Sequence, residues 1–407
     1  MVGQYQGPEG VAALAVVAPI WNVIYSLGLL MGIGGSVIFS TLRGGKRNKK
    51  EDENEYFTAA VIGSVVLASL AWAGIICFER PVLLFFGAEE VTLSLAQVYL
   101  VPIKYVFPCF LFNQMLAAFL RNDKNPGLAT GAVLSGGIFN VVGDYVFVFV
   151  LDMGIFGAGL ATAMGSVITF LVMLTHFLTK RNTLALVRPF RALDKMRKIV
   201  ITGFSTFFID VAMGILTVLF NRQIVKYLGT DALAVYGVIV NVSTFVQCCA
   251  YSVGQAAQPI ISINYGAKLG GRIKETLKYS LAMAVFFSAF WTALTLMVPN
   301  LFIKIFMSPT PEVLQIAPGI IRVYGISFLL LPLNIFSTYY FQALMKPKAA
   351  FFVSVSRGMV ISGLLILSLP VLLRPDALWM AMPVTELVVV VFVMARMKKY
   401  TKELSIS

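Results

Sequence analysis

The sequence predicts an all-α polytopic membrane protein with two pseudo-symmetric helical lobes around a central cavity, and three observations lead to this prediction. The 407 residues are 58% hydrophobic and only 13% charged, with a mean hydropathy of +0.85, whereas soluble domains carry about 25% charged residues. Apolar stretches of about 20 residues recur, and each is long enough to cross a hydrocarbon core of roughly 30 Å. The third observation is an internal repeat. Together they indicate that lipid, not water, solvates this chain.

Eleven apolar segments are predicted to cross the membrane. They cover residues 11–42, 56–78, 93–119, 127–151, 154–179, 200–225, 232–264, 276–300, 313–343, 349–373 and 377–396.

The loops between these segments predict the orientation. Alternate loops collect 24 of the 32 basic residues, in clusters at 43–50, 121–124, 180–198, 268–278, 346–348 and 396–402. The opposite loops hold only Arg80, Lys226, Lys304 and Arg374. Because basic residues accumulate on the cytoplasmic side, we expect a multi-pass protein of the plasma (inner) membrane with a cytoplasmic C-terminus and an extracytoplasmic N-terminus. The net charge of +13 therefore reflects topology, and no nucleic-acid partner is expected.

The two halves of the chain resemble each other. Gly32 and Gly44 match Gly254 and Gly266 at an offset of 222, and Asn113 matches Asn334 at an offset of 221. We therefore predict an N-lobe over 1–190 and a C-lobe over 191–407. Repeats of this size are typical of transporters whose halves rock around a shared cavity.

The repeat also predicts that the first lobe is shorter by one helix. The second lobe begins its first helix near Lys198, and no matching segment precedes residue 11. We expect five spans in the first lobe and six in the second, whereas two equal halves of the repeat would each have six spans.

Several motifs together resemble the multidrug and toxic compound extrusion (MATE) family of secondary transporters, over the whole chain. They lie at residues 7–14 with Ala18-Pro19, 121–126, 140–144, 154–162 and 258–266. The resemblance implies twelve helices in two six-helix lobes and export of bulky, often cationic compounds in exchange for H⁺ or Na⁺. It also implies that the family's first helix is missing here, together with an acidic residue that relatives place shortly before the position of Val2.

Asp144 is the first candidate for the chemistry. It lies within an apolar segment, and a carboxylate at membrane depth costs about 2.5–3.5 kcal/mol on insertion scales. Asn140 lies four residues earlier, on the same helical face. Carboxylate and amide oxygens can coordinate Na⁺, and a carboxylate in a low-dielectric site can also hold a proton. The family resemblance adds the Thr162 hydroxyl and the Ala158 backbone carbonyl. The alternative is that Asp144 and Asn140 only join neighbouring helices.

Asp210, also within an apolar segment, matches a position where many relatives have Glu or Asp. It is predicted as a carboxylate for cation or substrate in the second lobe, or as a polar lock to an Asn such as Asn241. Gln258 and Pro259 are candidates for lining the cavity or for a helix break at it. Asn113 and Asn334 are expected either to line the cavity or to join helices.

These observations lead to one function and two alternatives. The main prediction is a secondary active antiporter for small-molecule drugs, with H⁺ or Na⁺ as coupling ion and no cofactor. The sequence has no P-loop, no His-Glu-x-x-His and no Gly-x-Ser-x-Gly motif, so no enzyme is expected. A lipid-linked oligosaccharide flippase would need cations in its cavity, for which only Lys104, Arg222, Arg322 and Arg357 are candidates. The missing helix leaves an inactive truncated transporter as the other alternative. Nothing in the sequence indicates an oligomeric state.

Overall fold

The computed structural model describes residues 2–45, 52–307 and 309–404 of the chain, and they contain helices but no β-strand. Ten helices are long and apolar enough to cross a membrane, and a bent pair supplies an eleventh span within these residues. Each predicted segment corresponds to one of these spans, which confirms the predicted multi-pass helical fold. Most basic residues of the first predicted loop, at positions 46–50, lie outside the described residues.

Many side chains on the outer faces of the helices are large, apolar and exposed. Leu70, Leu364 and Val391 each expose about two thirds of their surface, at 66%, 64% and 66%. Soluble proteins rarely expose contiguous apolar surface on this scale, so these faces are suited to contact with lipid.

The chain forms two compact units. One comprises Met1–Phe39 with Lys49–Phe207, and the other comprises Ser40–Asn48 with Phe208–Ser407. Two long helices, α1 (Val2–Gly44) and α7 (Ala192–Tyr227), contribute residues to both units. Since α7 is divided at Phe207, this division does not decide the predicted lobe boundary between residues 190 and 191, which stays a prediction.

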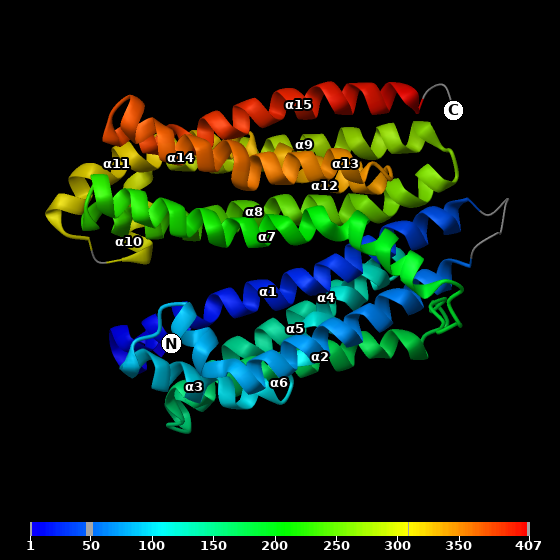
Figure 1. Cartoon of the computed structure of the whole chain (residues 1–407), viewed down its shortest axis with the longest axis horizontal. Coiled ribbons are helices and arrows are strands. Elements are labelled where there is room, and N and C mark those ends of the chain that lie inside the picture. Colours follow the sequence, from blue (N-terminus) through cyan, green and yellow to red (C-terminus); the bar gives the residue numbers. More distant parts are fainter. Residues whose placement is uncertain (1, 46–51, 308, 405–407) are drawn as a thin grey trace. The chain divides into compact units, whose positions relative to one another are not determined.

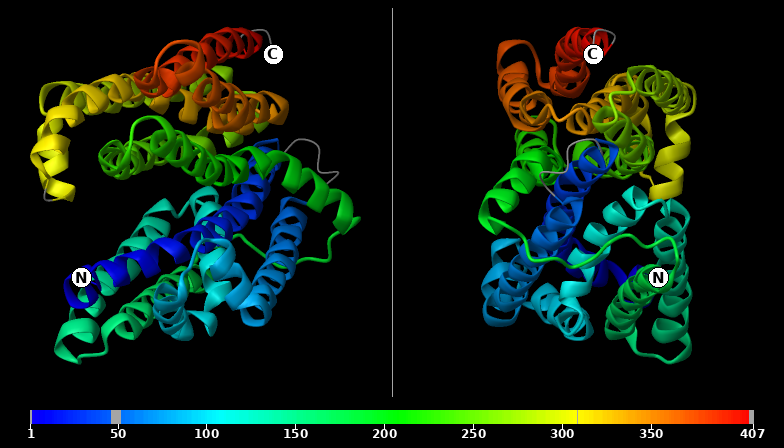
Figure 2. Two further views of the ribbon diagram at one scale, coloured as in Figure 1. Left: turned by 60° about the vertical axis from the view of Figure 1, so that its left-hand side comes forward. Right: turned by 90° about the vertical axis from the view of Figure 1, so that its right-hand side faces the viewer.

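The first unit is built from helices that pack side by side (Figures 1 and 2). Helix α5 packs along α6, which also contacts α3 and α4, and α2 packs on α4. Besides parts of α1 and α7, the elements of this unit are α2 (Glu53–Phe85), α3 (Glu90–Lys104), α4 (Phe107–Asn122), α5 (Pro126–Tyr145), a π-helical turn (Val146–Val150), α6 (Gly154–Leu174) and a 3-10 turn (Thr175–Leu178).

A proline explains the bend between α3 and α4. The two helices meet at 61°, and Pro108 lies in the first turn of α4. In a continuous helix the backbone N–H of residue 108 would donate to the carbonyl of Lys104, but proline has no N–H. The indole Nε1 of Trp72 donates to that carbonyl instead, at 2.6 Å. The sequence thus supplies both the break and the donor that satisfies the freed carbonyl.

Glycines let α1 and α7 approach closely within the first unit. A Cβ at Gly34 would lie 2.2 Å from the carbonyl oxygen of Ile199, and a Cβ at Gly203 would lie 2.1 Å from that of Leu30. Only a residue without a side chain fits at either position, as in other close helix crossings within membranes.

The second unit is also a helical bundle, in which α12 and α9 pack on α8 and α15 packs on α12 and α14. Its elements in chain order, after α7, are α8 (Thr230–Gly266), α9 (Gly270–Met297), α10 (Pro299–Phe306), α11 (Pro311–Gly325), a 3-10 turn (Ile326–Leu329), α12 (Leu331–Ala343), α13 (Pro347–Val355), a π-helical turn (Ser356–Val360), α14 (Ile361–Leu372), a 3-10 turn (Pro375–Met380) and α15 (Ala381–Glu403).

Candidate functional site

The predicted carboxylate Asp144 lies at the C-terminal end of α5, one turn after Asn140. The π-helical turn Val146–Val150 begins two residues after Asp144. In this turn the Leu151 N–H donates to the carbonyl of Val146, five residues earlier, at 2.9 Å. Such turns inside helices are frequent at functional sites. The Asp144 side chain is half-buried, and its Oδ1 is buried without a hydrogen-bond partner in the described part of the chain.

Three of the predicted residues are joined by hydrogen bonds around the Thr162 hydroxyl of α6. Asn140 donates from Nδ2 to Thr162 Oγ1 at 3.1 Å, and Thr162 donates to the backbone carbonyl of Ala158 at 3.0 Å. The structure therefore brings Asn140, Thr162 and Ala158 together, as the family resemblance implied.

Tyr99 of α3 is a further member of this cluster that the sequence analysis did not identify. Its hydroxyl lies 3.2 Å from Thr162 Oγ1. A threonine hydroxyl has one proton, and Thr162 donates its proton to the Ala158 carbonyl. Tyr99 is therefore the donor in its hydrogen bond with Thr162. The side chain of Tyr99 is buried and within electrostatic range of Asp144. Helix α3 also contains Thr92, Ser94 and Gln97, so nothing in the sequence singled out Tyr99 among its polar residues.

This cluster offers oxygen atoms of the kind that a hard cation prefers. Asp144 contributes the negative charge, Asn140, Thr162 and Tyr99 contribute side-chain oxygens, and Ala158 contributes a backbone carbonyl. A carboxylate oxygen without a donor is also a place where a proton can bind. The residues are therefore compatible with either H⁺ or Na⁺.

Asp210 has a different environment in the second unit. It is half-buried in α7, and the Tyr251 hydroxyl of α8 lies 3.4 Å from its Oδ1. The same hydroxyl lies 3.3 Å from Gln247 Oε1, and its single proton is shared between the two acceptors. The partner of Asp210 is thus Tyr251 and not Asn241, whose Nδ2 donates to the Gly237 carbonyl of its own helix.

The position of Asp210 along α7 places it near the middle of the bilayer. Lys198 and Arg222 are the nearest charged residues before and after it, each twelve residues away. At 1.5 Å per residue each of these two residues lies about 18 Å from Asp210 along the helix. This distance slightly exceeds half the thickness of a hydrocarbon core of roughly 30 Å, so both charges can lie just outside the core.

Asn113 and Asn334 both join helices. Asn113 donates from Nδ2 to the carbonyl and the hydroxyl of Ser166 in α6, both at 3.0 Å. Asn334 donates to the backbone carbonyl of Glu386 in α15 at 3.0 Å and to its carboxylate at 2.6 Å. In each residue Oδ1 is buried without a hydrogen-bond partner among the described residues.

The helix break predicted at Gln258 and Pro259 is absent. Helix α8 runs from Thr230 to Gly266 through Pro259. The Ser262 hydroxyl donates to the Gln258 carbonyl at 2.8 Å and approaches the Pro259 carbonyl at 3.3 Å. The helix continues through Pro259 although proline lacks the N–H that would donate to the Gln255 carbonyl, so the prediction of a break was wrong. The alternative role of these two residues in lining a cavity stays a prediction.

An ion pair that was not predicted from the sequence is buried in the second unit. Arg357, in the π-helical turn Ser356–Val360, donates from Nε to Glu386 Oε1 at 2.6 Å. The side chains of Arg357 and Glu386 are 6% and 0% exposed. An acidic residue inside an apolar segment indicates a functional role or a charged partner. Glu386 is such a residue, so its pairing could have been suspected from the sequence.

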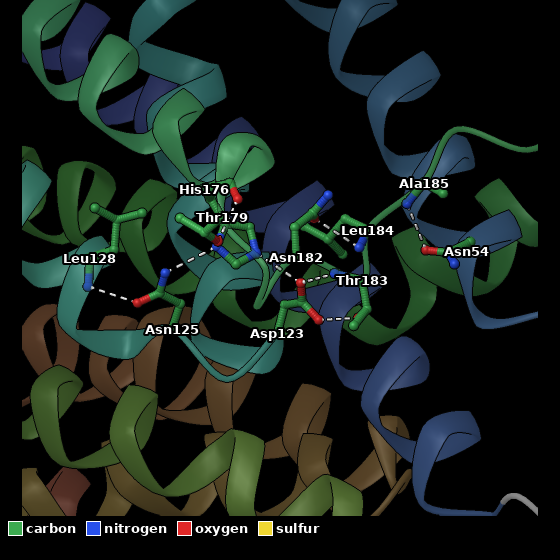
Figure 3. Close-up of polar contacts among 10 residues, drawn as sticks. All are labelled: Asn54, Asp123, Asn125, Leu128, His176, Thr179, Asn182, Thr183, Leu184 and Ala185. Atoms are coloured by element: carbon green, nitrogen blue, oxygen red, sulfur yellow. Dashed lines mark hydrogen bonds and ion pairs between the residues drawn. The ribbon is translucent and has the colours of Figure 1, made fainter.

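A second missed cluster lies at the end of the first unit, around Asp123 (Figure 3). His176 Nε2 lies 2.8 Å from Asp123 Oδ2, and His176 Nδ1 lies 3.1 Å from the amide nitrogen of Asn125. Thr183 donates to Asp123 from its backbone N–H, at 2.8 Å, and from its hydroxyl. The cluster holds the start of the segment 179–191, which links α6 to α7, against the end of α4.

The sequence matches the family model MatE over residues 1–146 and 206–366. The chain belongs to the MatE family. The two matched segments cover most of the chain and include the Asp144, Asn140, Asp210, Asn113 and Asn334 positions, whereas Ala158 and Thr162 lie between the two segments.

Individual relatives extend this result over both halves of the protein. The multidrug export protein MepA of Staphylococcus saprophyticus is 25% identical over 355 residues, which are 86% of this chain and 77% of that protein. MepA of Staphylococcus haemolyticus is also 25% identical, over 88% of this chain and 79% of that protein.

Solved structures share the fold. The MATE multidrug transporter DinF-BH superposes with a TM-score of 0.87 at 25% identity, covering 98% of this chain and 89% of that one. A transporter of the MOP superfamily from Pyrococcus furiosus gives a TM-score of 0.88 at 19% identity, covering 98% and 89%. The two-lobed MATE fold is therefore shared by this chain.

Proposed function

We propose that this protein is a secondary active antiporter that exports bulky, often cationic drugs across the plasma membrane in exchange for H⁺ or Na⁺. The observation that carries the proposal is the Asp144 carboxylate, whose buried Oδ1 has no hydrogen-bond partner within the described residues. It lies in a membrane-spanning helix beside the Asn140, Thr162 and Tyr99 cluster. A carboxylate within a membrane-spanning helix that has a buried oxygen without a donor among the described residues is expected to serve ion or substrate binding.

The Asp144 cluster has two states that a coupling ion can select between. An ionised carboxylate only accepts hydrogen bonds, whereas a protonated one also donates. Protonation would give Asp144 a donor for the Asn140 amide oxygen or the Tyr99 hydroxyl. Binding of Na⁺ would instead draw the same oxygens toward the metal. In both cases, an ion that binds one conformation more tightly shifts the equilibrium of the transporter toward it.

Relatives support the choice of substrate class. MepA is named as a multidrug export protein, and DinF-BH is named as a multidrug transporter. By this analogy the substrates are small molecules, and Asp210, near mid-membrane in the second unit, is a second carboxylate for a cationic drug or an ion.

The positions of the basic residues favour an exporter over a lipid-linked oligosaccharide flippase. Lys104 is paired with Glu79 at 2.7 Å, and Arg357 is paired with Glu386. Arg322 donates from Nε to the Leu296 carbonyl at 3.0 Å. These three cations are already engaged by protein groups and are poorly suited to hold the phosphates of a lipid-linked sugar. Only Arg222, an exposed residue near the end of α7, is left as a candidate for that role.

The test is drug resistance in efflux-deficient cells that express the wild-type protein, Asp144→Asn or Asp152→Asn. Asp152 is an exposed acid in the loop after the same helix and serves as the control. We expect Asp144→Asn to lose most of the resistance and Asp152→Asn to retain it, at equal amounts of protein in the membrane. Equal resistance with Asp144→Asn would overturn the role of Asp144.

Proteoliposomes then identify the coupling ion. Dye export driven by a pH gradient alone would indicate H⁺, and export driven by a Na⁺ gradient at constant pH would indicate Na⁺. Export that needs neither gradient would contradict the antiport proposal.

A further inference from the structure

A basic cavity lies beside the start of α7 in the first unit. It has a volume of about 510 Å³ and is lined by Phe190, Arg191, Asp194, Lys195, Arg197, Lys198 and Ile201. Four of these residues are cationic and one is acidic, so the lining carries a formal charge of +3. Nothing in the proposed transport cycle uses this cavity.

The cavity is built by a segment that is tied down along its length, and the start of this segment is shown in Figure 3. Backbone N–H groups of the segment donate to side chains of α2. Ala185 donates to Asn54 Oδ1 at 3.1 Å, Val187 to Thr58 Oγ1 at 3.0 Å, and Phe190 to Glu55 Oε2 at 2.7 Å. These three bonds hold residues 185–190 against α2, next to the residues that line the cavity.

The cations in the cavity fall into two groups. Lys195 is only 5% exposed, pairs with Glu55 at 3.2 Å, and lies over the ring of Tyr56 with Nζ 4.8 Å from its centroid. Lys198 donates to the Tyr56 hydroxyl at 3.1 Å. Arg191 and Arg197 are exposed, as is Lys198, and the guanidinium carbon of Arg191 lies 5.6 Å from the centroid of the Phe190 ring. The first group holds the wall of the cavity, and the second is available to a ligand.

The geometry of α7 places the cavity at the depth of lipid headgroups. The helix has 36 residues and is therefore about 54 Å long, so it extends well beyond a hydrocarbon core of roughly 30 Å. The polar N-terminal end of α7 comprises the residues up to Lys198. Phe190 and Leu193 are 72% and 81% exposed next to the cations, and Ile201, one turn deeper, is 50% exposed. Exposed apolar and basic side chains together are typical of the membrane interface.

We propose that this cavity binds the phosphate headgroup of an anionic phospholipid. Guanidinium groups at Arg191 and Arg197 can each hold phosphate oxygens through two N–H donors. The exposed face at Ile201 continues toward the hydrocarbon, where the acyl chains would lie. Basic pockets between membrane helices bind such headgroups elsewhere. The proposal does not depend on the transport activity.

The experiment measures lipid retention on the purified full-length protein by native mass spectrometry. The protein is exchanged into detergent with equal amounts of phosphatidylglycerol and phosphatidylcholine. We compare wild type with Arg191→Gln/Arg197→Gln. The control, Arg272→Gln/Lys278→Gln, removes the same charge from exposed residues of another predicted cytoplasmic loop. Lys and Arg near a surface each contribute roughly fivefold to anionic lipid binding.

We expect wild type to retain phosphatidylglycerol over phosphatidylcholine, and the site variant to lose that preference by about fivefold or more, while the control keeps it. Arg191→Lys/Arg197→Lys, which keeps the charge, should retain part of the preference and shows that the site variant is not simply misfolded. Equal losses in site variant and control, or no preference in wild type, would overturn the proposal. Complete displacement of the lipid by millimolar inorganic phosphate would also overturn it in favour of a soluble phosphate ligand.

Discussion

Asn113 in the first unit and Asn334 in the second occupy equivalent positions of the repeat, and each donates from Nδ2 to a neighbouring helix. The acceptor differs. In the first unit it is the neutral Ser166, whereas in the second it is Glu386, which also binds Arg357. The same position of the repeat thus supports a neutral helix contact in one unit and a buried ion pair in the other.

This comparison separates two uses of charge within a membrane. The Glu386 carboxylate has a guanidinium on one oxygen and an amide on the other, so its charge joins α12, α15 and the π-helical turn of Arg357. The Asp144 carboxylate has a buried oxygen with no such partner in the described residues. A π-helical turn accompanies both charges, following Asp144 in one unit and containing Arg357 in the other. Pairing and complete burial, rather than local helix geometry, distinguish the structural charge from the candidate binding charge, since Glu386 is fully buried and Asp144 only half-buried.

The largest expected effect comes from breaking the ion pair on one side. Glu386→Gln keeps an acceptor for Asn334 but leaves Arg357 buried without a counter-charge. We expect it to lower the free energy of unfolding by about 3 kcal/mol or more, measured by thermal unfolding in detergent. Glu386→Gln/Arg357→Met removes both charges and should be less destabilised than Glu386→Gln alone. A double variant as unstable as the sum of the two single variants would contradict the pairing.

A smaller effect tests the repeat directly. Leucine has nearly the shape of asparagine but no hydrogen bonds. Asn334→Leu loses a bond to a charged group, which contributes roughly 1.5–3 kcal/mol, whereas Asn113→Leu loses bonds to neutral groups, which contribute about 1 kcal/mol. We therefore expect Asn334→Leu to lower the melting temperature more than Asn113→Leu. The same or the opposite order would mean that the two units do not differ in this way.

The smallest expected effect on stability is at Asp144. Asp144→Asn removes a charge from a carboxylate with an unpartnered buried oxygen, so we expect the free energy of unfolding to change by no more than about 0.5 kcal/mol, although transport is lost. Thermal unfolding of the purified variant measures this. A loss of more than about 1 kcal/mol would show that Asp144 holds helices together, as Glu386 does.

Part of the candidate site could be read from the sequence. The four-residue spacing of Asn140 and Asp144 places both on one face of α5, because an α-helix has 3.6 residues per turn. Tyr99 could not be found in this way, since it approaches Thr162 from a helix more than 60 residues earlier. The pairing of Arg357 with Glu386 also depends on which helices become neighbours.

The sequence by itself determined the spans, the all-helical fold and the presence of charges such as Asp144 and Asp210 within apolar segments. These follow from local properties: the length of each apolar run and the cost of leaving a peptide group without a hydrogen bond in lipid. Only the tertiary structure decided which buried charge has a partner. That depends on contacts between residues distant in the chain, which set Glu386 against Arg357 and left an oxygen of Asp144 without a donor.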